Sequence, residues 1–430
     1  MPIDTTDAAA RLDLVRRAVG RELAPEPLPS DDVDLGESGR VDSMMQVNIL
    51  LAVEEAAGVE GFAAEWPEDR PFSVRQIAEG LLQAQPTSQP AEKISAGEQR
   101  GPSLPTSEVS IKGWAFSAGS LVIPAEQIDA ECGFESGFLR DRAGIETERR
   151  ASADEDESAL AVRSAEGALE VAGLTPASVD LLVGVSTTDL DLPSFAARVH
   201  AELLLCDTAG AVDIGGACCG VIYGLATALS LLSTMNKRTA LVVASEVNSR
   251  RLASMDVPPE FRALFGDAAC AFVLERTAAG DGVPGRRLRD FIWGASSTFS
   301  SALSVVWPPG GGPHVEFSGQ QLAGAAIETL ERVFDRLANL SGVLIADVDQ
   351  FALHEPNPRV VAMLARKAGI PPEKVPQTSP ISGNLGSVTC GVNLCKALAA
   401  TADADRGSRA SVTFAAAVGP GLLWGGAYIS

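Results

Sequence analysis

The chain has 430 residues, more than one ordinary hydrophobic core accommodates, so its length predicts two or more domains. It carries 34 basic against 56 acidic residues, and a net charge of −22 argues against binding nucleic acid or an anionic membrane surface. Seven cysteines, an odd count without regular or paired metal-type spacing, indicate a reducing compartment and not a disulfide framework. With no leader-like start and no apolar run long enough to span a bilayer, we expect a cytoplasmic protein.

Residues 1–85 are expected to form a small, acidic, all-α domain. They hold 17 acidic residues against seven arginines, and helical periodicity is clear in 10–19 and again in 44–57. The turn-rich loop between these helices ends in Asp-Ser-Met, with Ser43 at the start of the second helix. From position alone, Ser43 is an N-cap, because serine before a helix usually bonds the first turn.

The next segment, residues 86–107, is rich in Pro, Ser, Gln and Gly, which predicts a flexible linker. From 108 to 430, apolar strands and helical segments alternate. That alternation predicts an α/β fold in which helices cover a largely buried sheet.

The α/β segment also repeats itself. The stretch 173–185 is echoed by 342–353, and similar echoes follow later in each part. We therefore expect two similar halves, about 109–275 and 286–430.

The strongest chemical signal lies in 211–220, where a short apolar run meets two glycines and then two thiols. The small, apolar residues from Val221 to Leu232 predict a central helix buried on all sides. A helix N-terminus lowers the pKa of a thiol and offers N–H groups to an oxyanion, so Cys218 or Cys219 is a candidate acyl-accepting nucleophile. The alternative is that both are small core residues.

Candidate partners for a reactive thiol lie in the second half. His354 directly follows the predicted strand 350–353, and the carboxyl ends of α/β strands are where functional side chains gather. Asn384 lies in a glycine-bounded loop before another helix of small residues. The other two histidines, His200 and His314, have no comparable setting.

Residues 108–430 resemble β-ketoacyl-acyl carrier protein synthase III of the thiolase superfamily. The resemblance implies a thiolase-like fold layered α-β-α-β-α, with Cys218 as the nucleophile, His354 and Asn384 as its catalytic partners, and no metal. Cys219 then stays a core residue. Five ordered motifs carry the match: Arg-x-Gly-Ile at 142–145, Asp-x-x-x-x-Cys-x-Gly at 213–220, Phe-Gly-Asp at 265–267, His-x-x-Asn-x-Arg at 354–359 and Gly-Asn at 383–384.

The activity implied by the resemblance is a decarboxylative condensation in fatty-acid- or polyketide-type biosynthesis. Cys218 takes an acyl group from a thioester, and His354 and Asn384 stabilise the enolate of a malonyl-type unit on a carrier protein. An alternative on the same fold is an acyltransferase that passes the acyl group from Cys218 to a hydroxyl, an amine or a carrier thiol; a third is a catalytically silent scaffold. Asn384 favours condensation, because simple transfer needs no second enolate donor.

The resemblance also assigns residues to substrate and carrier binding. Arg359 matches the family's docking residue for the acidic helix of a carrier, a charge-assisted contact. Arg142 is retained near the expected coenzyme A site, but Phe138 stands where the family commonly has a tryptophan. The choice between coenzyme A and a carrier as acyl donor therefore stays open.

Two further positions depart from the family pattern. Leu192 stands in a shortened loop where the family places an aromatic that limits the acyl pocket. Pro420 lies in the glycine-rich loop that supplies the second oxyanion donor, and proline has no N–H. The donor is then expected from a neighbour such as Gly419.

The N-terminal segment resembles an acyl carrier protein, a helical bundle whose Asp-Ser-Leu triplet opens the second helix. The resemblance implies that Ser43 carries phosphopantetheine, and that the carrier acts in cis or in trans. The synthase III resemblance of residues 108–430 implies, in addition, a homodimer in which the strand 241–245 pairs with its symmetry mate.

Overall fold

The computed structural model describes residues 7–23, 27–36, 38, 41, 43–59, 62–63, 66–67, 70–84, 107–278, 286–296, 302–402 and 410–430, without the side chains of residues 43, 44, 55, 107 and 320. The chain divides into two units. The first comprises 1–103 with 318–328, and the second 104–317 with 329–430.

The N-terminal part of the first unit contains α1 (Ala8–Leu23), α2 (Ser43–Ala57) and α3 (Val74–Gln83). Each buries apolar side chains, among them Leu14, Leu50 and Ile77. The backbone of Ser43 begins α2, but its side chain lies outside the described part of the chain, as do Asp42 and the predicted linker apart from its last residue. The carrier identity of this unit therefore stays a prediction.

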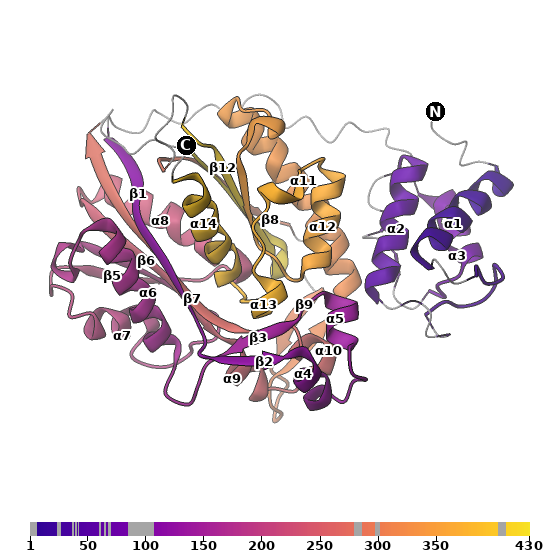
Figure 1. Cartoon of the computed structure of the whole chain (residues 1–430), viewed down its shortest axis with the longest axis horizontal. Coiled ribbons are helices and arrows are strands. Elements are labelled where there is room, and N and C mark those ends of the chain that lie inside the picture. Colours follow the sequence, from indigo (N-terminus) through magenta and orange to yellow (C-terminus); the bar gives the residue numbers. More distant parts are fainter. Residues whose placement is uncertain are drawn as a thin grey trace. The chain divides into compact units, whose positions relative to one another are not determined.

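The second unit is built on two main sheets (Figure 1). In the first, the strand order is β1-β7-β6-β4-β5, and in the second β11-β12-β13-β8. The strands of the first sheet are β1 (Ser107–Ala118), β4 (Leu181–Val185), β5 (Gly210–Ile214), β6 (Thr239–Val247) and β7 (Asp267–Ala278), and those of the second are β8 (Leu288–Ala295), β11 (Gln350–Leu353), β12 (Thr413–Gly419) and β13 (Leu423–Ile429).

Both sheets share one pairing scheme. β4 runs parallel to β6, which pairs antiparallel with β7, and β11, β12 and β13 repeat that arrangement. The two echoed segments, 173–185 and 342–353, each end in the equivalent strand, β4 or β11. The repeat in the sequence thus corresponds to two sheets of the same topology, as the thiolase-like fold requires.

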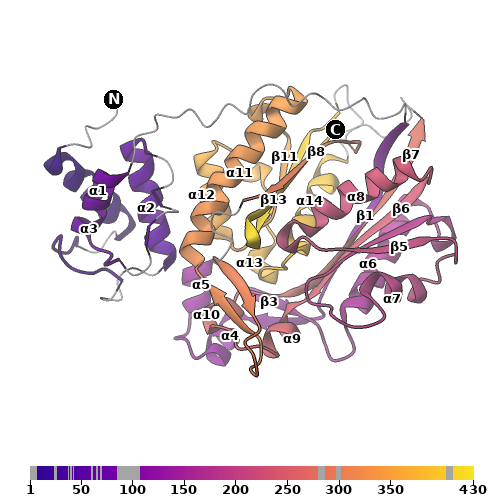
Figure 2. The same cartoon turned by 180° about the vertical axis from the view of Figure 1, so that it is seen from behind.

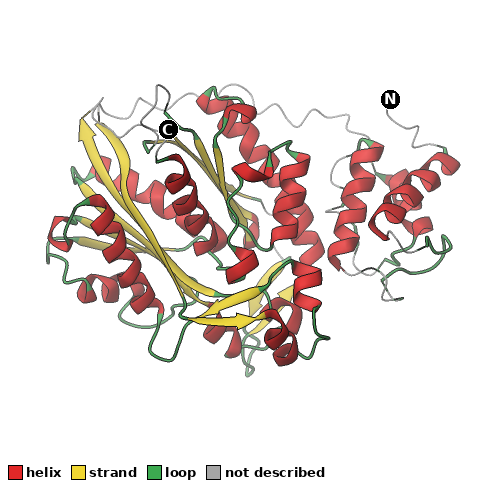
Figure 3. Ribbon diagram, viewed as in Figure 1, coloured by secondary structure: helices red, strands yellow, loops and turns green. Residues whose placement is uncertain are grey.

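Two central helices, α8 (Gly220–Thr234) and α14 (Val388–Thr401), lie between the sheets (Figures 2 and 3). They share one apolar cluster with both sheets, which includes Leu225, Val242, Leu394 and Ala415. This layer is apolar on most faces because it meets a sheet on either side.

Outer helices complete the layers. α6 (Glu157–Ala172) and α7 (Phe195–Glu202) pack on the far face of the first sheet. α11 (Gly319–Ser341) lies on the second sheet, where Phe334 contacts Phe351 edge-on, and α12 (Pro358–Lys367) lies beside α11. The remaining strands form two small antiparallel sheets, β2 (Leu121–Pro124) with β3 (Thr147–Arg150) and β9 (Leu303–Val306) with β10 (His314–Phe317), and the other α-helices are α4 (Ala125–Cys132), α5 (Phe138–Ala143), α9 (Asn248–Ala253), α10 (Pro259–Arg262) and α13 (Ser379–Ser382).

The structure corrects two expectations. The strand 241–245 is part of β6, which lies between β7 and β4, so it has no free edge to pair with a symmetry mate. The free edge beyond β4 belongs to β5. In addition, the segment Ala217–Thr234 is long and apolar enough to cross a membrane by length and composition, although half of it is buried and core helices pass the same test.

Candidate active site

The two thiols lie in η2 (Ala217–Cys219), a single 3-10 turn between β5 and α8. The backbone enters this turn through Gly216 at φ 152° and Ala217 at φ 45°, a left-handed conformation that side chains rarely adopt. Cys219 N donates to Gly216 O at 2.9 Å and closes the turn. Cys218 therefore precedes α8, which begins at Gly220, and is not in the helix's first turn.

The backbone of the second half approaches Cys218 closely at Gly419. A Cβ atom placed on Gly419 would lie 3.0 Å from both the Cβ and the backbone N of Cys218. Only glycine leaves room for this contact. The structure thus brings together Cys218 and Gly419, the residue from which the sequence predicts an oxyanion donor.

The environment of the Cys218 thiol is the opposite of that expected from a helix N-terminus. Burial, reinforced by the charge of Glu246, raises the pKa of Cys218 to about 12, although its own backbone N–H acts in the other direction. The expectation of a lowered thiol pKa is therefore wrong for the unliganded site. The effect of burial outweighs that of the turn.

Its neighbour Cys219 has the contacts of a core residue. The Sγ atom of Cys219 lies 3.3 Å from Ala417 O and 3.4 Å from Leu423 O, and the residue is fully buried. Burial raises the pKa of this thiol as well. Both carbonyl partners belong to the second half, so Cys219 helps to join the halves beneath the turn.

His354 lies at the carboxyl end of β11, where its backbone N donates to Ala416 O at 2.9 Å. Burial lowers the pKa of the imidazole to about 4, while a backbone hydrogen bond with Gly386 opposes that shift. Ring atom Nδ1 is buried and has no hydrogen-bond partner among the residues that the structure describes. The ring is therefore a neutral group near pH 7, with one nitrogen unused by the protein.

Asn384 is held by its own loop, with the orientation that a donor requires. Its Oδ1 accepts from Gly386 N at 2.9 Å and from Thr389 Oγ1 at 3.3 Å. No hydrogen bond to Nδ2 is found among the described residues. The backbone of Gly386 also acts on the ring of His354, where it opposes the lowering of the imidazole pKa, so one residue lies against both predicted donors.

A fourth residue, Glu246 near the end of β6, was not among the predicted site residues. It is fully buried, and its carboxylate accepts from Ser387 Oγ at 2.5 Å. A Cβ on Gly220 would lie 3.3 Å from Ser387 Cβ, which places this contact beside the nucleophile turn. An ionisable residue within the apolar strand 239–247 was the signal in the sequence, because such residues are seldom fully buried without a role.

Three other predicted residues gather around α5. Phe138 stacks on Phe134 with ring centroids 4.2 Å apart, so one face of its ring is occupied. Arg142 lies on the same helix, and Arg359 Nη2 donates to the carbonyl of Asp141. The candidate donor and carrier contacts are therefore adjacent in space.

Two predicted residues are not brought to this group. Leu192 lies in the loop after β4 with 92% of its surface exposed, outside the buried site of one chain. The side chain of Ser43 is not described. Within the described ranges, no group of three or more His, Cys, Asp or Glu residues is placed to hold a metal ion.

Comparison with known proteins agrees with this arrangement. The sequence profile of 3-oxoacyl-[acyl-carrier-protein] synthase III matches residues 212–295, and the profile of its C-terminal part matches 339–430. The β-ketoacyl-[acyl-carrier-protein] synthase III of Erythrobacter litoralis HTCC2594 is 33% identical over 274 residues, which are 62% of this chain and 83% of the relative. That of Alkalilimnicola ehrlichii MLHE-1 is 32% identical over 304 residues, covering 68% and 90%.

Solved structures of the same family also superimpose on this chain. The 3-oxoacyl-(acyl carrier protein) synthase III of Pseudomonas aeruginosa PAO1 superimposes with a TM-score of 0.65 at 25% sequence identity. The match covers 75% of this chain and 98% of that protein. The predicted condensing activity and thiolase-like fold are thereby confirmed: this chain belongs to the β-ketoacyl-[acyl-carrier-protein] synthase III family of condensing acyltransferases.

Proposed function

We propose that Cys218 carries the acyl group of this condensing enzyme and that His354 and Asn384 activate a malonyl-type unit on a carrier protein. Acylation transfers the acyl group from a donor thioester to the Cys218 sulfur and releases the donor thiol. Loss of carbon dioxide leaves an enolate on the malonyl-derived unit. The enolate carbon bonds to the acyl carbonyl, and the Cys218 sulfur leaves with the electron pair of the C–S bond.

The observation that carries this proposal is the shared contact of the two donors with Gly386. Its N–H donates to Asn384 Oδ1, which leaves Nδ2 as a donor, and its backbone also acts on the His354 ring by opposing the lowering of its pKa. A neutral imidazole and an amide that both donate to one oxygen would stabilise an enolate without prior protonation. The next residue, Ser387, packs on Gly220, so these donors belong to the same site as the nucleophile.

The test is to incubate the protein with an acyl thioester and a malonyl carrier, and to measure carbon dioxide together with the intact mass of protein and carrier. Condensation predicts an acyl adduct on Cys218, carbon dioxide release and a β-ketoacyl carrier. An adduct followed by acyl transfer without carbon dioxide would favour the acyltransferase alternative. No adduct at all would favour a silent scaffold.

For substrate entry, we propose the surface around α5. Arg359 would contact the acidic helix of a carrier, with Arg142 and Phe138 beside the donor thioester. The Phe138–Phe134 stack leaves one ring face of Phe138 for a ligand. A higher KM for the carrier in Arg359→Ala, with acylation of Cys218 unchanged, would support this assignment. An unchanged KM for the carrier would contradict it.

For the N-terminal unit, we propose an acyl carrier whose Ser43 bears phosphopantetheine. It is supported by the Asp42-Ser43-Met44 triplet at the start of α2 and by the acidic composition of residues 1–85. A tether of about 20 residues would keep the arm at an effective concentration on the order of millimolar. A broad-specificity phosphopantetheinyl transferase should add one arm to the wild type and none to Ser43→Ala.

We propose a cytoplasmic homodimer, now through β5. All seven cysteines are free thiols, as in a reducing compartment. β5 is an uncovered edge with alternately exposed residues, and such an edge is commonly paired with a second copy. Sedimentation at micromolar concentration should give a dimer that Val212→Pro weakens, because proline removes a ladder N–H; a wild-type monomer would refute it.

A further inference from the structure

Glu246 is a buried carboxylate surrounded by donors and by no cation. Its two oxygens accept from Thr187 N, Thr187 Oγ1 and Thr188 N at 2.9–3.2 Å, and from Ser387 Oγ at 2.5 Å. No Lys or Arg of the described chain donates to it or pairs with it. Burying a carboxylate without a counter-ion is costly, and an apolar side chain would fill the same place more cheaply.

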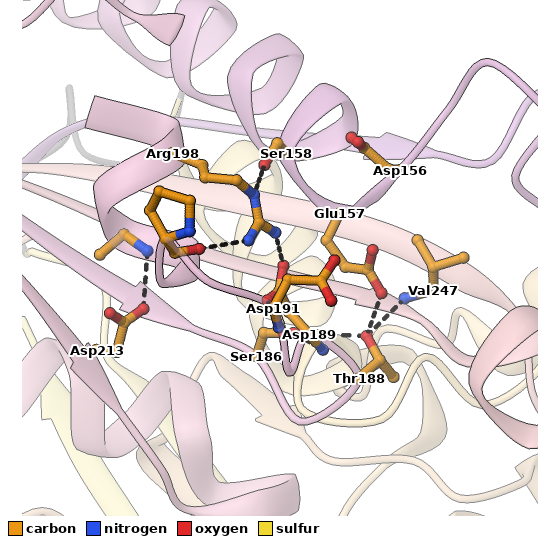
Figure 4. A network of polar contacts seen from close by, with 12 residues as sticks. Asp156, Glu157, Ser158, Ser186, Thr188, Asp189, Asp191, Arg198, Asp213 and Val247 are labelled. Carbon is orange, nitrogen blue, oxygen red and sulfur yellow. Dashed lines mark hydrogen bonds and ion pairs between the residues drawn. The ribbon is translucent and has the colours of Figure 1, made fainter. Parts of the chain in front are cut away.

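One of these donors, Thr188, makes further hydrogen bonds on the side away from Glu246 (Figure 4). Thr188 Oγ1 donates to Glu157 Oε1 at 2.8 Å and accepts from Val247 N at 3.0 Å. One residue further, Asp189 forms an ion pair with Arg198, whose Nη1 also donates to Pro193 O at 2.6 Å. These contacts fix the backbone of the loop after β4, so its N–H groups are preorganised to donate to Glu246.

On its other side, Glu246 contacts the loop that holds both proposed enolate donors. A Cβ on Gly386 would lie 3.4 Å from Glu246 Cγ, so the stem of the glutamate packs beneath that glycine. Gly386 bonds Asn384 Oδ1, and its neighbour Ser387 donates to the carboxylate. Moving this carboxylate would move the loop that aims Asn384.

The charge of Glu246 also acts on Cys218, where it disfavours the reactive thiolate. Glu246 raises the pKa of the Cys218 thiol, second to burial; burial also raises the pKa of Glu246 itself, and its hydrogen bonds to Thr187, Thr188 and Ser387 oppose that shift. The titratable groups around this carboxylate are Cys218 in the turn before α8, Cys270 on the neighbouring strand β7, His354 through Gly386 at the end of β11, and Glu157 through Thr188 at the start of α6. Glu246 therefore disfavours the thiolate of Cys218, whereas its direct contacts hold the loop that carries Asn384.

We propose that Glu246 is a positioning residue for the decarboxylation step: it fixes the Gly386–Ser387 backbone, and through it the amide of Asn384 and the ring of His354, at the expense of thiol reactivity. This inference deepens the proposed function and rests on the roles assigned there to Cys218, His354 and Asn384. It predicts that one substitution changes the two half-reactions in opposite directions. A merely structural role would lower both.

The decisive variant is Glu246→Gln. Its amide oxygen can still accept from the Thr187 and Thr188 N–H groups, and its NH2 can donate to Ser387 Oγ, so the fold is retained. Removing the charge should speed alkylation of Cys218 by iodoacetamide about fivefold, since a lower pKa gives more thiolate. Carbon dioxide release from malonyl carrier should fall about tenfold, because the donors are less well placed.

Two further variants complete the design. Ser387→Ala keeps the charge but removes its link to the loop, so decarboxylation should fall about threefold while alkylation is unchanged. Glu157→Gln is the matched control, because Glu157 is bonded to Thr188 and not to Glu246 itself. Its rates of alkylation and of carbon dioxide release should both stay within about twofold of wild type. Circular dichroism and thermal melting of each variant check the fold, and Ser387→Ala decides the question if Glu246→Gln does not fold.

Equal rates in Glu246→Gln and wild type, or a parallel fall of both rates in that variant with no effect of Ser387→Ala, would overturn the inference. A wild type that releases no carbon dioxide from any malonyl-type carrier would instead overturn the proposed function. Alkylation of Glu246→Gln at the wild-type rate would then still show that Glu246 does not act on Cys218.

Discussion

The two halves place different chemistry at equivalent positions. The turn before the central helix of the first half runs through Gly216 at φ 152° to Cys218, and the turn before the central helix of the second runs through Gly383 at φ 71° to Asn384. Each uses a glycine in a conformation that other residues rarely adopt. The duplicated frame gives two matched loops, one carrying the proposed nucleophile and the other the proposed hydrogen-bond donor.

The ends of β6 and β12 show a second equivalence, which crosses between the halves. β6 of the first half carries Glu246, which packs under Gly386 of the second half. β12 of the second half ends at Gly419, which packs against Cys218 of the first. Each half thus supports the reactive loop of the other, and neither half forms the site alone.

The electrostatic environments of Cys218 and His354 also differ between the two halves. Burial raises the pKa of the Cys218 thiol to about 12 and lowers that of the His354 imidazole to about 4. Both groups are therefore neutral in the unliganded site near pH 7. The comparison suggests that the reactive loop of the first half serves acylation and that of the second serves decarboxylation, each with support from the other half, and the predictions below test that division.

The largest effect is expected from Cys218→Ser. A serine hydroxyl in the same place is a far weaker nucleophile, so acylation by a reactive thioester should fall by at least about 10³-fold. Peptide mapping of the wild type should locate the adduct on Cys218. Cys219→Ala is the control and should remain acylated; label on Cys219 that persists in Cys218→Ser would contradict the assignment.

A smaller effect, confined to one step, is expected from Asn384→Ala in the second half. Losing one preorganised donor costs about 3 kcal/mol, so carbon dioxide release from malonyl carrier should fall on the order of 100-fold. Acylation of Cys218, followed by intact mass, should be largely unchanged because its donors lie elsewhere. A matching loss of acylation would show that the two halves do not divide the reaction.

Gly419→Ala tests the contact by which the second half supports Cys218 of the first half. The added Cβ would meet Cys218 at 3.0 Å, too close for both backbones to keep their places. Acylation should fall about tenfold, as expected for a displacement of a few tenths of an ångström at the nucleophile. Gly312→Ala, whose Cβ would have no neighbour within 4 Å, should acylate at the wild-type rate.

Much of this arrangement could be predicted from local sequence. Strand–helix alternation and the echo of 173–185 in 342–353 indicate two α/β halves, because both depend on residues close in the chain. The glycine-bounded turns at Cys218 and Asn384 are visible for the same reason. Their alignment with the family motifs then supplied the roles proposed for the two residues.

What the sequence did not reveal depends on distant contacts. The edge strand is β5 and not β6, because strand order follows from long-range pairing that alternation does not encode. The thiol pKa of Cys218 rises because residues from both halves bury it. Glu246 was missed because its partners, Thr187 and Ser387, lie 59 and 141 residues away in the sequence.

The smallest expected effect concerns the pH dependence of stability in the second half. His354 has a pKa of about 4 when folded against an ordinary value of 6.5, so the unfolded chain binds the proton more readily. Between these values the free energy of unfolding should therefore fall as the pH falls, and below about pH 4 this contribution should change no further. From pH 7 to about 5.5, His354 should account for a loss of about 1 kcal/mol.

Urea unfolding of the wild type and His354→Gln at both pH values measures this loss as the difference between the two proteins. The same comparison between about pH 7 and 8 is the control, since His354 is then neutral in both states and the two proteins should change equally. An equal loss of stability in both proteins between about pH 7 and 5.5 would show that the imidazole is not held in the dry, neutral environment on which its role as an enolate donor depends.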